Sequence, residues 1–268
     1  MNSGLIDEVS AILRNAAADV VLPRFQKLQA GQIEEKSPGE VVTIADREAE
    51  QIITPRLMSL LPGSRVVGEE ATAETPALMD ELDEGDVWLV DPIDGTANFV
   101  AGSPVFSVMV ALLRRGETVA AWLLEPVSDR LAVASLGAGA FVDGIRLHTE
   151  SSCPDVASSR GAVLTRFLPD ALKKTVAANA SRFSAILPGT RCSGVDYPAV
   201  ATGKQNFVMF WRLLPWDHAP GALLLSEAGG WVARLDGSSY DPSDQRPGLL
   251  AAQNRDVWQT VRRKLLET

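Results

Sequence analysis

The sequence predicts a layered α/β fold, with helices packed on mixed sheets, and three patterns support this prediction. Two long segments, 5–29 and 46–61, carry apolar residues at helical spacing. Short β-rich segments separated by tight turns follow between 105 and 142, which is typical of an antiparallel meander. Towards the C-terminus, strand-like and helix-like segments alternate. We therefore expect two halves, 1–150 and 151–268.

The N-terminal half is expected to contain the two helices and a series of strands. Pro23 kinks or ends the first helix and Pro55 bends the second, because proline lacks the backbone hydrogen-bond donor. A turn is expected at 36–40, an acidic turn at 69–70 and a surface segment at 71–86, where no apolar pattern is seen. The expected strands are 41–43, 65–68, 87–90, 105–113, 119–124, 131–135 and 140–142.

In the C-terminal half, β-rich segments alternate with segments of helical spacing. The expected strands are 162–165, 183–187, 207–210, 231–233 and 249–252, and the expected helices are 170–179, 195–202, 217–228 and 254–266.

The composition excludes several classes of function. The 268 residues carry a formal net charge of −9 and no basic stripe, which argues against nucleic acid as a partner. We expect a cytoplasmic protein, because no apolar run could span a bilayer, the N-terminus lacks a signal-peptide pattern, and Cys153 and Cys192 make no disulfide framework. With only His148 and His218 present, zinc sites and Ser-His-Asp catalysis are disfavoured, and oxygen ligands are expected.

The stretch 87–100 contains the pattern most indicative of function. Four apolar residues, 87–90, predict a buried strand, and Pro92 is expected to stop it because proline cannot donate a ladder hydrogen bond. Asp91 and Asp94 would then lie on the loop at the carboxyl end of this strand. Paired carboxylates in such a position favour a hard cation.

The two residues that follow indicate a phosphate site. Gly95 permits a tight turn, and Thr96 is expected to cap the short helix after it. Backbone N–H groups at a helix start favour phosphate oxygens. With Mg²⁺ between them, the carboxylates and the helix start would form a phosphate-processing site.

Glu69 and Asp217 also stand at the ends of predicted elements, and we expect them to join Asp91 and Asp94. Two carboxylates about 4 Å apart repel by roughly 4 kcal/mol at an effective dielectric constant of about 20. Several such pairs exceed a net stability of about 5–15 kcal/mol unless cations or protons neutralise them. All-oxygen ligation favours Mg²⁺, Mn²⁺ or Ca²⁺ over zinc.

Four motifs follow one another along nearly the whole chain. They are Val42-Thr43-Ile44-Ala45-Asp46 after Lys36, Gly68-Glu69-Glu70, Asp91-Pro92-Ile93-Asp94-Gly95-Thr96 with Asn98-Phe99, and Trp216-Asp217-His218-Ala219-Pro220-Gly221 with Glu227-Ala228-Gly229-Gly230. In these motifs the sequence resembles the inositol monophosphatase family of metal-dependent, lithium-sensitive phosphomonoesterases. The resemblance implies an alternating α-β-α-β-α sandwich of the inositol monophosphatase and fructose-1,6-bisphosphatase type, a small-molecule phosphate monoester as substrate, and a homodimer.

The resemblance also implies a role for each matched position. Two or three Mg²⁺ ions would be held by Glu69, Asp91, the carbonyl oxygen of Ile93, Asp94 and Asp217. Gly95 and Thr96 would bind the phosphate through backbone N–H groups. Asp46, Glu69 and Thr96 would be catalytic and prepare a metal-bound water for in-line displacement without a phosphoenzyme.

On the substrate side the sequence departs from the inositol enzymes. Phe210 stands where they carry a glutamate that accepts hydrogen bonds from inositol hydroxyls, and a phenyl ring cannot accept them. The expected substrate contacts are Gly194, Val195, Asp196, Phe210 and Arg212. An aromatic, amino-bearing or anionic leaving group suits these residues better than inositol, unless Phe210 packs at a subunit contact.

Other functions stay open at this point. Within the family, histidinol phosphate or a 3′-phosphonucleotide is a possible substrate, although the nucleotide phosphatases are expected to be longer and to have extra basic contacts. Outside it, the chain could be a non-catalytic interaction protein that keeps the fold. Such a protein is expected to lose its acidic residues, whereas every metal position is filled here.

Overall fold

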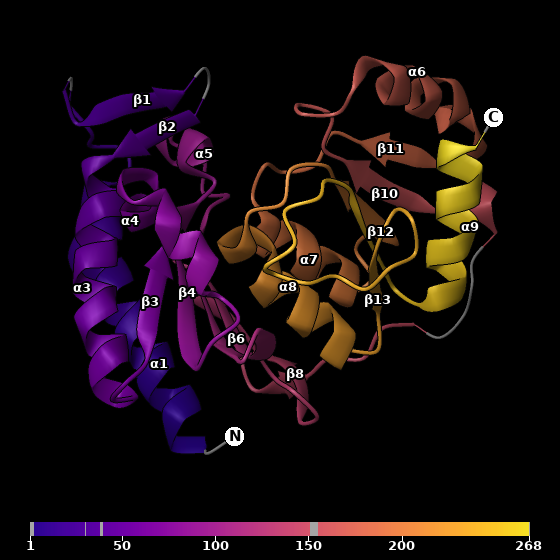
Figure 1. The fold of residues 1–268 in the computed structure, drawn as a ribbon. Coiled ribbons are helices and arrows are strands. Elements are labelled where there is room, and N and C mark those ends of the chain that lie inside the picture. The colour runs from indigo at the N-terminus through magenta and orange to yellow at the C-terminus, as the bar shows by residue number, and fades with distance from the viewer. Residues whose placement is uncertain (1–2, 30, 38–39, 151–154, 268) are drawn as a thin grey trace.

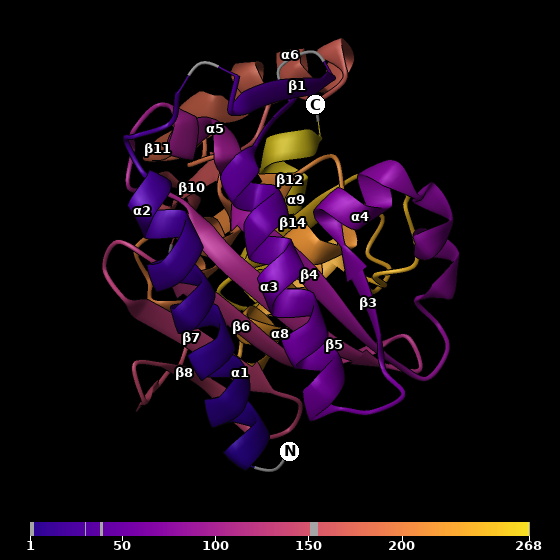
Figure 2. The ribbon, with the colours of Figure 1, turned by 90° about the vertical axis from the view of Figure 1, so that its left-hand side faces the viewer.

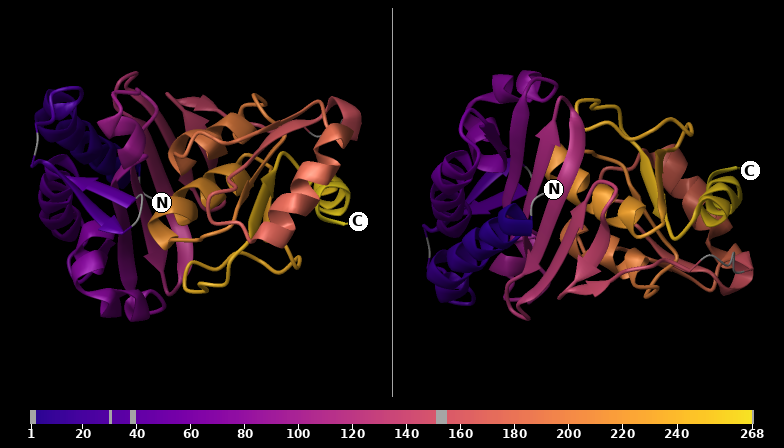
Figure 3. Two further views of the ribbon diagram at one scale, coloured as in Figure 1. Left: turned by 90° about the horizontal axis from the view of Figure 1, so that it is seen from above. Right: turned by 90° about the horizontal axis from the view of Figure 1, so that it is seen from below.

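The computed structural model describes residues 3–29, 31–37, 40–150 and 155–267. Its elements form five layers in the order helices, sheet, helices, sheet, helices (Figures 1 and 3). The layered α/β prediction and the sandwich implied by the resemblance are therefore confirmed. No helix in the described ranges is both long enough and apolar enough to cross a membrane.

The first layer contains two long helices that lie across the outer face of the larger sheet (Figure 2). The first, α1 (Ser3–Ala16), continues through a π-helical turn, η1 (Ala17–Val21), into α2 (Leu22–Arg24). This helical run ends at Arg24 rather than at residue 29, with Pro23 in its last turn. The second, α3 (Ile44–Leu60), continues through Pro55.

A two-stranded antiparallel hairpin precedes α3. It consists of β1 (Ile33–Ser37) and β2 (Glu40–Thr43). The sequence predicted only β2, because every residue of β1 is exposed and no apolar alternation marks the strand. Thr43 then caps α3, and the Asp46 carboxylate accepts the Thr43 N–H at 2.8 Å to complete a capping box.

The second layer is a seven-stranded sheet whose strands follow chain order. β3 and β4 are parallel, and each later pair is antiparallel, so the predicted meander is confirmed. Both faces are buried, since α1 and α3 cover one and the third layer covers the other, which is why β5 is almost wholly apolar. The strands are β3 (Arg65–Gly68), β4 (Asp86–Asp94), β5 (Ser107–Arg114), β6 (Glu117–Glu125), β7 (Arg130–Ser135), β8 (Gly139–Val142) and β9 (Ile145–Arg146).

The prediction that Pro92 stops the central strand is wrong, because β4 continues to Asp94. Opposite β5, Asp91 pairs with Met109 and Asp94 pairs with Ser107, so β4 has one extra residue at this point and forms a bulge. A bulge tolerates proline, since no ladder donor is needed there. In a regular strand Asp91 and Asp94 would face opposite sides, and the extra residue brings both to the face covered by the third layer.

The predicted acidic turn after β3 is also wrong, because residues 69–74 form a helix, α4 (Glu69–Glu74). The buried Glu50 carboxylate on α3 accepts the N–H groups of Glu70 and Ala71, each at 2.9 Å. This carboxylate replaces the cap that the local sequence lacks. The segment that follows includes a 3₁₀ helix, η2 (Pro76–Glu81), with no buried residue.

The remaining layers come from the C-terminal part of the chain. A five-stranded sheet has the order β11-β10-β12-β14-β13, with β10 parallel to both β11 and β12. Helices α7 and α8 fill the space between the two sheets, and α6 and α9 cover the far face (Figure 1). The elements are η3 (Val156–Ser158), β10 (Arg160–Val163), α6 (Asp170–Asn179), η4 (Ala180–Arg182), β11 (Ala185–Leu187), α7 (Ser193–Ala201), β12 (Phe207–Phe210), α8 (Pro215–Glu227), β13 (Trp231–Arg234), β14 (Leu249–Ala252) and α9 (Arg255–Leu266).

Candidate active site

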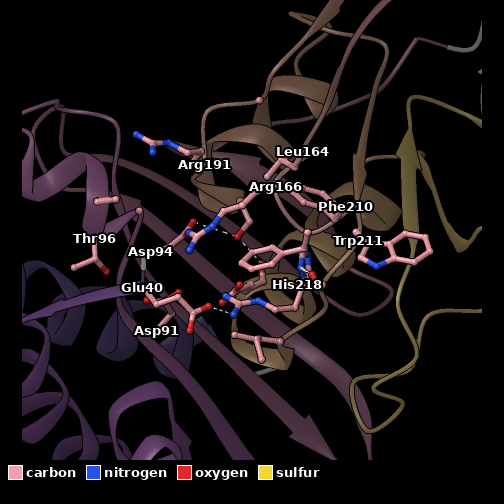
Figure 4. Close-up of a pocket in the computed structure, with 18 of the residues that line it drawn as sticks. Glu40, Asp91, Asp94, Thr96, Leu164, Arg166, Arg191, Phe210, Trp211 and His218 are labelled. Atoms are coloured by element: carbon pink, nitrogen blue, oxygen red, sulfur yellow. Dashed lines mark hydrogen bonds and ion pairs between the residues drawn. The ribbon is translucent and has the colours of Figure 1, made fainter. Parts of the chain in front are cut away.

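A pocket of about 490 Å³ opens where the larger sheet meets α8 and the loop after β12 (Figure 4). Its size is typical of sites for small molecules. Nine of the residues singled out in the sequence line it, although they span positions 69 to 217. They are Glu69, Asp91, Ile93, Asp94, Gly95, Thr96, Phe210, Arg212 and Asp217.

Three elements bring the carboxylate cluster, Glu69, Asp91, Asp94 and Asp217, into this pocket. Glu69 is the first residue of α4, Asp91 and Asp94 flank the β4 bulge, and Asp217 lies in the first turn of α8. Burial, followed by repulsion from Glu69, Asp94 and Asp217, raises the pKa of Asp91 well above its ordinary value. Burial likewise raises the pKa of Asp217, and Asp94 and Glu69 add to the shift. The negative charges of the cluster therefore destabilise one another.

Lys36 provides a positive charge beside the cluster. Its ammonium lies 3.2 Å from Glu69 Oε1 and 2.5 Å from Glu70 Oε1. Burial nevertheless raises the pKa of Glu69 to about 7, although Lys36 opposes the shift. Within the described ranges, no three Asp, Glu, His or Cys side chains are already arranged to hold a metal ion.

Asp94 is held by groups from two other elements. Its Oδ2 accepts the N–H of Gly194 at 2.7 Å, and the hydroxyls of Ser193 and Ser107 lie at 3.1 and 3.3 Å. Burial raises the pKa of Asp94, and these hydrogen bonds partly oppose the shift. The Ser193 hydroxyl is also 2.6 Å from the carbonyl oxygen of Asp217, so it connects two members of the cluster.

Asp46 lies behind the pocket wall and contacts Thr96. The Thr96 hydroxyl is 3.1 Å from Asp46 Oδ1 and 2.9 Å from the carbonyl oxygen of Ile93, and its single proton can serve only one of them at a time. Asp46 Oδ2 accepts both the N–H and the hydroxyl of Thr43. Burial raises the pKa of Asp46 to about 6 despite these hydrogen bonds.

Gly95, rather than Thr96, is the N-cap of the short helix α5 (Thr96–Val100), so the capping prediction for Thr96 is wrong. Gly95 has a φ of 87°, a conformation that favours glycine, and a Cβ there would lie 3.1 Å from the carbonyl oxygen of Val105. The Thr96 side chain is consequently free of a capping role and reaches Asp46 instead. The first N–H groups of a helix have no partner within it and are suited to an anion.

Gly194, Val195 and Asp196 begin α7 and are absent from the residues that line the pocket. Gly194 contacts Asp94 from behind. Asp196 is buried, and both of its carboxylate oxygens lie 3.2 Å from the backbone nitrogen of Thr190. Burial raises the pKa of Asp196 to about 7. The structure thus places these residues beneath the site, where they support it.

Phe210 lines the pocket and is 3% exposed. Its ring stacks on Tyr197 with 5.1 Å between centroids and meets the edge of His218 at 4.6 Å. The two His218 ring nitrogens lie 3.2 Å from the Tyr197 hydroxyl and 3.1 Å from the carbonyl oxygen of Arg212. Burial lowers the pKa of His218 to about 3, so this side chain is neutral and serves in packing.

The sequence reasoning missed two of the three arginines on the pocket wall, Arg166 and Arg191, although a signal for both was present. Arg166, Arg191 and Arg212 each follow the carboxyl end of β10, β11 or β12. Because these strands are parallel, their carboxyl ends meet at one edge of the sheet. Only Arg212 was singled out. Glu40, which forms an ion pair with Arg212, was missed too, since the two residues are 172 positions apart.

Comparison with known proteins agrees with this site. The model of the inositol monophosphatase family matches residues 5–267. An inositol-1-monophosphatase of Mesorhizobium japonicum is 35% identical over 218 residues, which cover 80% of this chain and 79% of that protein. The Nus factor SuhB of Pseudomonas aeruginosa is 32% identical and covers 83% of both chains. The crystal structure of the extragenic suppressor protein suhB from Bartonella henselae superposes with a TM-score of 0.85 at 25% identity, over 98% of this chain and 99% of that one. The chain belongs to the inositol monophosphatase family.

Proposed function

We propose that this phosphomonoesterase of the inositol monophosphatase family hydrolyses a small-molecule phosphate monoester with a water prepared at the carboxylate cluster. The observation that carries the proposal is the meeting of Glu69, Asp91, Asp94 and Asp217 in one pocket with the start of α5. The cluster favours cations, and the helix start favours an anion. A phosphate monoester bound with a metal satisfies both.

The donor set fits divalent magnesium. All of its ligand atoms are oxygens, and burial together with mutual repulsion raises the pKa of Asp91 and Asp217, so a bound cation would stabilise their ionised forms. Two or three Mg²⁺ ions would be held by Glu69, Asp91, the Ile93 carbonyl oxygen, Asp94 and Asp217. When bound, Mg²⁺ lowers the pKa of water and offsets charge on the phosphoryl group. We propose lithium sensitivity for the same site.

Thr96 and Asp46 are proposed to orient the attacking water. With the Thr96 proton donated to Asp46 Oδ1, the hydroxyl oxygen can accept a hydrogen bond from water on the pocket side. Asp46 is held by Thr43, which fixes the direction of that donation. Glu69, which lines the same pocket, is proposed to accept the proton of the water.

The phosphate is proposed to lie against the N–H groups of Gly95 and Thr96, with the leaving group directed at Phe210 and Arg212. These two residues favour an aromatic, amino-bearing or anionic leaving group over inositol. We further propose that the protein is a cytoplasmic homodimer without a nucleic-acid partner. The net charge of −9 supports the last point.

A protein-binding role is a second candidate, because one relative is named a Nus factor. Phosphate release separates the two functions. Purified protein with Mg²⁺ would be screened by colorimetric phosphate detection on inositol, sugar, nucleotide and amino-alcohol phosphates, histidinol phosphate included. Turnover that is lost with chelator and with Asp91→Asn supports the phosphatase. Absence of turnover on every monoester would refute it and favour the interaction protein.

A further inference from the structure

One wall of the pocket differs in chemical character from the carboxylate cluster. It is formed by residues that follow the parallel strands β10 and β12, among them Arg166, Phe167 and Arg212. Apart from the carboxylate cluster, Glu40 is the only carboxylate among the described residues that line the pocket. This wall therefore offers cationic donors and aromatic side chains, and Glu40 as its one carboxylate acceptor among the described residues.

Arg212 is the best placed of these donors. Its guanidinium lies 4.3 Å from the centroid of the Phe167 ring, and Arg166 lies over the same ring at 4.7 Å. Phe167 is 41% exposed and lines the pocket, so a bound molecule can reach this side chain and the two cations over its ring. Arg212 lines the same pocket as Asp217 of the carboxylate cluster.

Arg212 already has a partner, because Glu40 forms an ion pair with it. One oxygen of its carboxylate forms an ion pair with the Arg212 guanidinium, and the other accepts the Ser37 hydroxyl at 2.7 Å. Glu40 comes from β2 in the N-terminal part, whereas Arg212 follows β12, and both residues line the pocket. Both are partly exposed, so the pair can exchange partners with a solute at modest cost.

We propose that Arg212 receives a second oxyanion, a carboxylate or a phosphate, carried by the leaving group of the substrate, and that this anion displaces Glu40. The proposal rests on the proposed phosphatase function and names its substrate class. A guanidinium binds a carboxylate or a phosphate through two parallel hydrogen bonds, which a hydroxyl cannot match. Glu40 thus acts as an internal competitor for Arg212, which the second anion of the substrate must displace.

Three substrates built on one sugar test the proposal. Glucose 1-phosphate has no second anion, glucuronate 1-phosphate adds a carboxylate at the far end, and glucose 1,6-bisphosphate adds a phosphate. With Mg²⁺ present, wild-type kcat/KM is expected to be higher for at least one anionic substrate by about tenfold or more. The anionic substrate with the higher kcat/KM shows whether the site binds a carboxylate or a phosphate. Equal kcat/KM for all three would overturn the proposal.

Two substitutions separate recognition from structural support, because each removes the same ion pair. Arg212→Gln is expected to lower kcat/KM for the anionic substrate by about tenfold or more relative to glucose 1-phosphate. Glu40→Gln is expected to raise kcat/KM for the anionic substrate several-fold relative to glucose 1-phosphate, since the competing carboxylate is gone. A structural role of the pair would move both variants in the same direction and would overturn the proposal. Arg56→Gln, an exposed position on α3, controls for the loss of one positive charge.

The two proposals fail in different ways. If none of the three sugar phosphates nor any monoester of the wider screen is hydrolysed, the phosphatase function itself fails. If glucose 1-phosphate is hydrolysed at least as well as its anionic analogues, only the assignment of Arg212 fails. Thermal unfolding of each variant, measured in parallel, shows whether the fold is intact.

Discussion

Replacing Gly194 by alanine is expected to lower both the stability and the activity of the protein. A Cβ at this position would lie 2.0 Å from Ser107 Oγ and 2.8 Å from Met109 Sδ, which are distances that real side chains do not tolerate. The start of α7 must therefore move away from β5. That movement lengthens the 2.7 Å hydrogen bond from the Gly194 N–H to Asp94.

The size of the effect follows from these two contacts. Overpacking a dense core costs about 1–3 kcal/mol, and a hydrogen bond to a charged group contributes about 1.5–3 kcal/mol, so the free energy of unfolding should fall by roughly 2.5–6 kcal/mol. At about 2–4 °C per kcal/mol for a chain of this size, the unfolding midpoint should fall by roughly 5–24 °C. Activity should fall as well, because the Asp94 carboxylate loses its orientation.

Differential scanning calorimetry and phosphate release on the purified variant check this prediction. A second variant, Gly194→Ala with Ser107→Gly, removes the closest atom and should recover part of the lost stability, which a double-mutant cycle measures. If Gly194→Ala unfolds within about 1 °C of the wild type, the close packing of α7 on β5 is not as the structure shows it, and the reasoning fails.

Three further outcomes are expected. Asp94→Asn should abolish phosphate release yet leave the unfolding midpoint in chelator unchanged or higher, because repulsion within the cluster is relieved; retention of more than about a tenth of the activity would contradict its role. Asp196→Asn should be more stable than the wild type at pH 8 but not at pH 5. The raised pKa of Asp196, about 7, lets the folded chain keep a proton that the unfolded chain loses from about pH 4, so stability falls as pH rises through that window, by up to roughly 4 kcal/mol. Mg²⁺ should raise the unfolding midpoint more at pH 8 than at pH 6, because it competes with protons held by Asp91 and Asp217 through their raised pKa; a pH-independent shift in calorimetry would argue against binding there.

The sheets and long helices could be predicted because their apolar patterns are local. The β5–β8 meander follows from short β-rich runs with turns between them, and α9 follows from helical spacing. β1 could not be predicted, since a fully exposed two-stranded hairpin carries no burial pattern. α4 could not be predicted either, because its cap comes from Glu50, 20 residues earlier in the chain. The division into halves at residue 150 stays a prediction.

The composition of the site was easier to predict than its supports. Asp91, Asp94 and Thr96 stand in one motif, and the pocket indeed brings them together with Glu69 and Asp217. The bulge at Pro92 depends on pairing with β5, which no local pattern shows. For the same reason the Glu40 to Arg212 ion pair, formed between distant segments, was invisible before the fold was known.

The hydroxyl of Ser193 has a consequence for how this enzyme would lose function. It stands at the start of α7 within hydrogen-bond distance of Asp94 on the sheet and of the Asp217 carbonyl on α8. Fraying of a single helical turn would release both at once, while the rest of the chain stays folded. Mild heat or urea should then inactivate the enzyme before the protein unfolds globally. Over the same range of conditions, amide hydrogen exchange in the first turn of α7 should become faster as the rate of phosphate release falls.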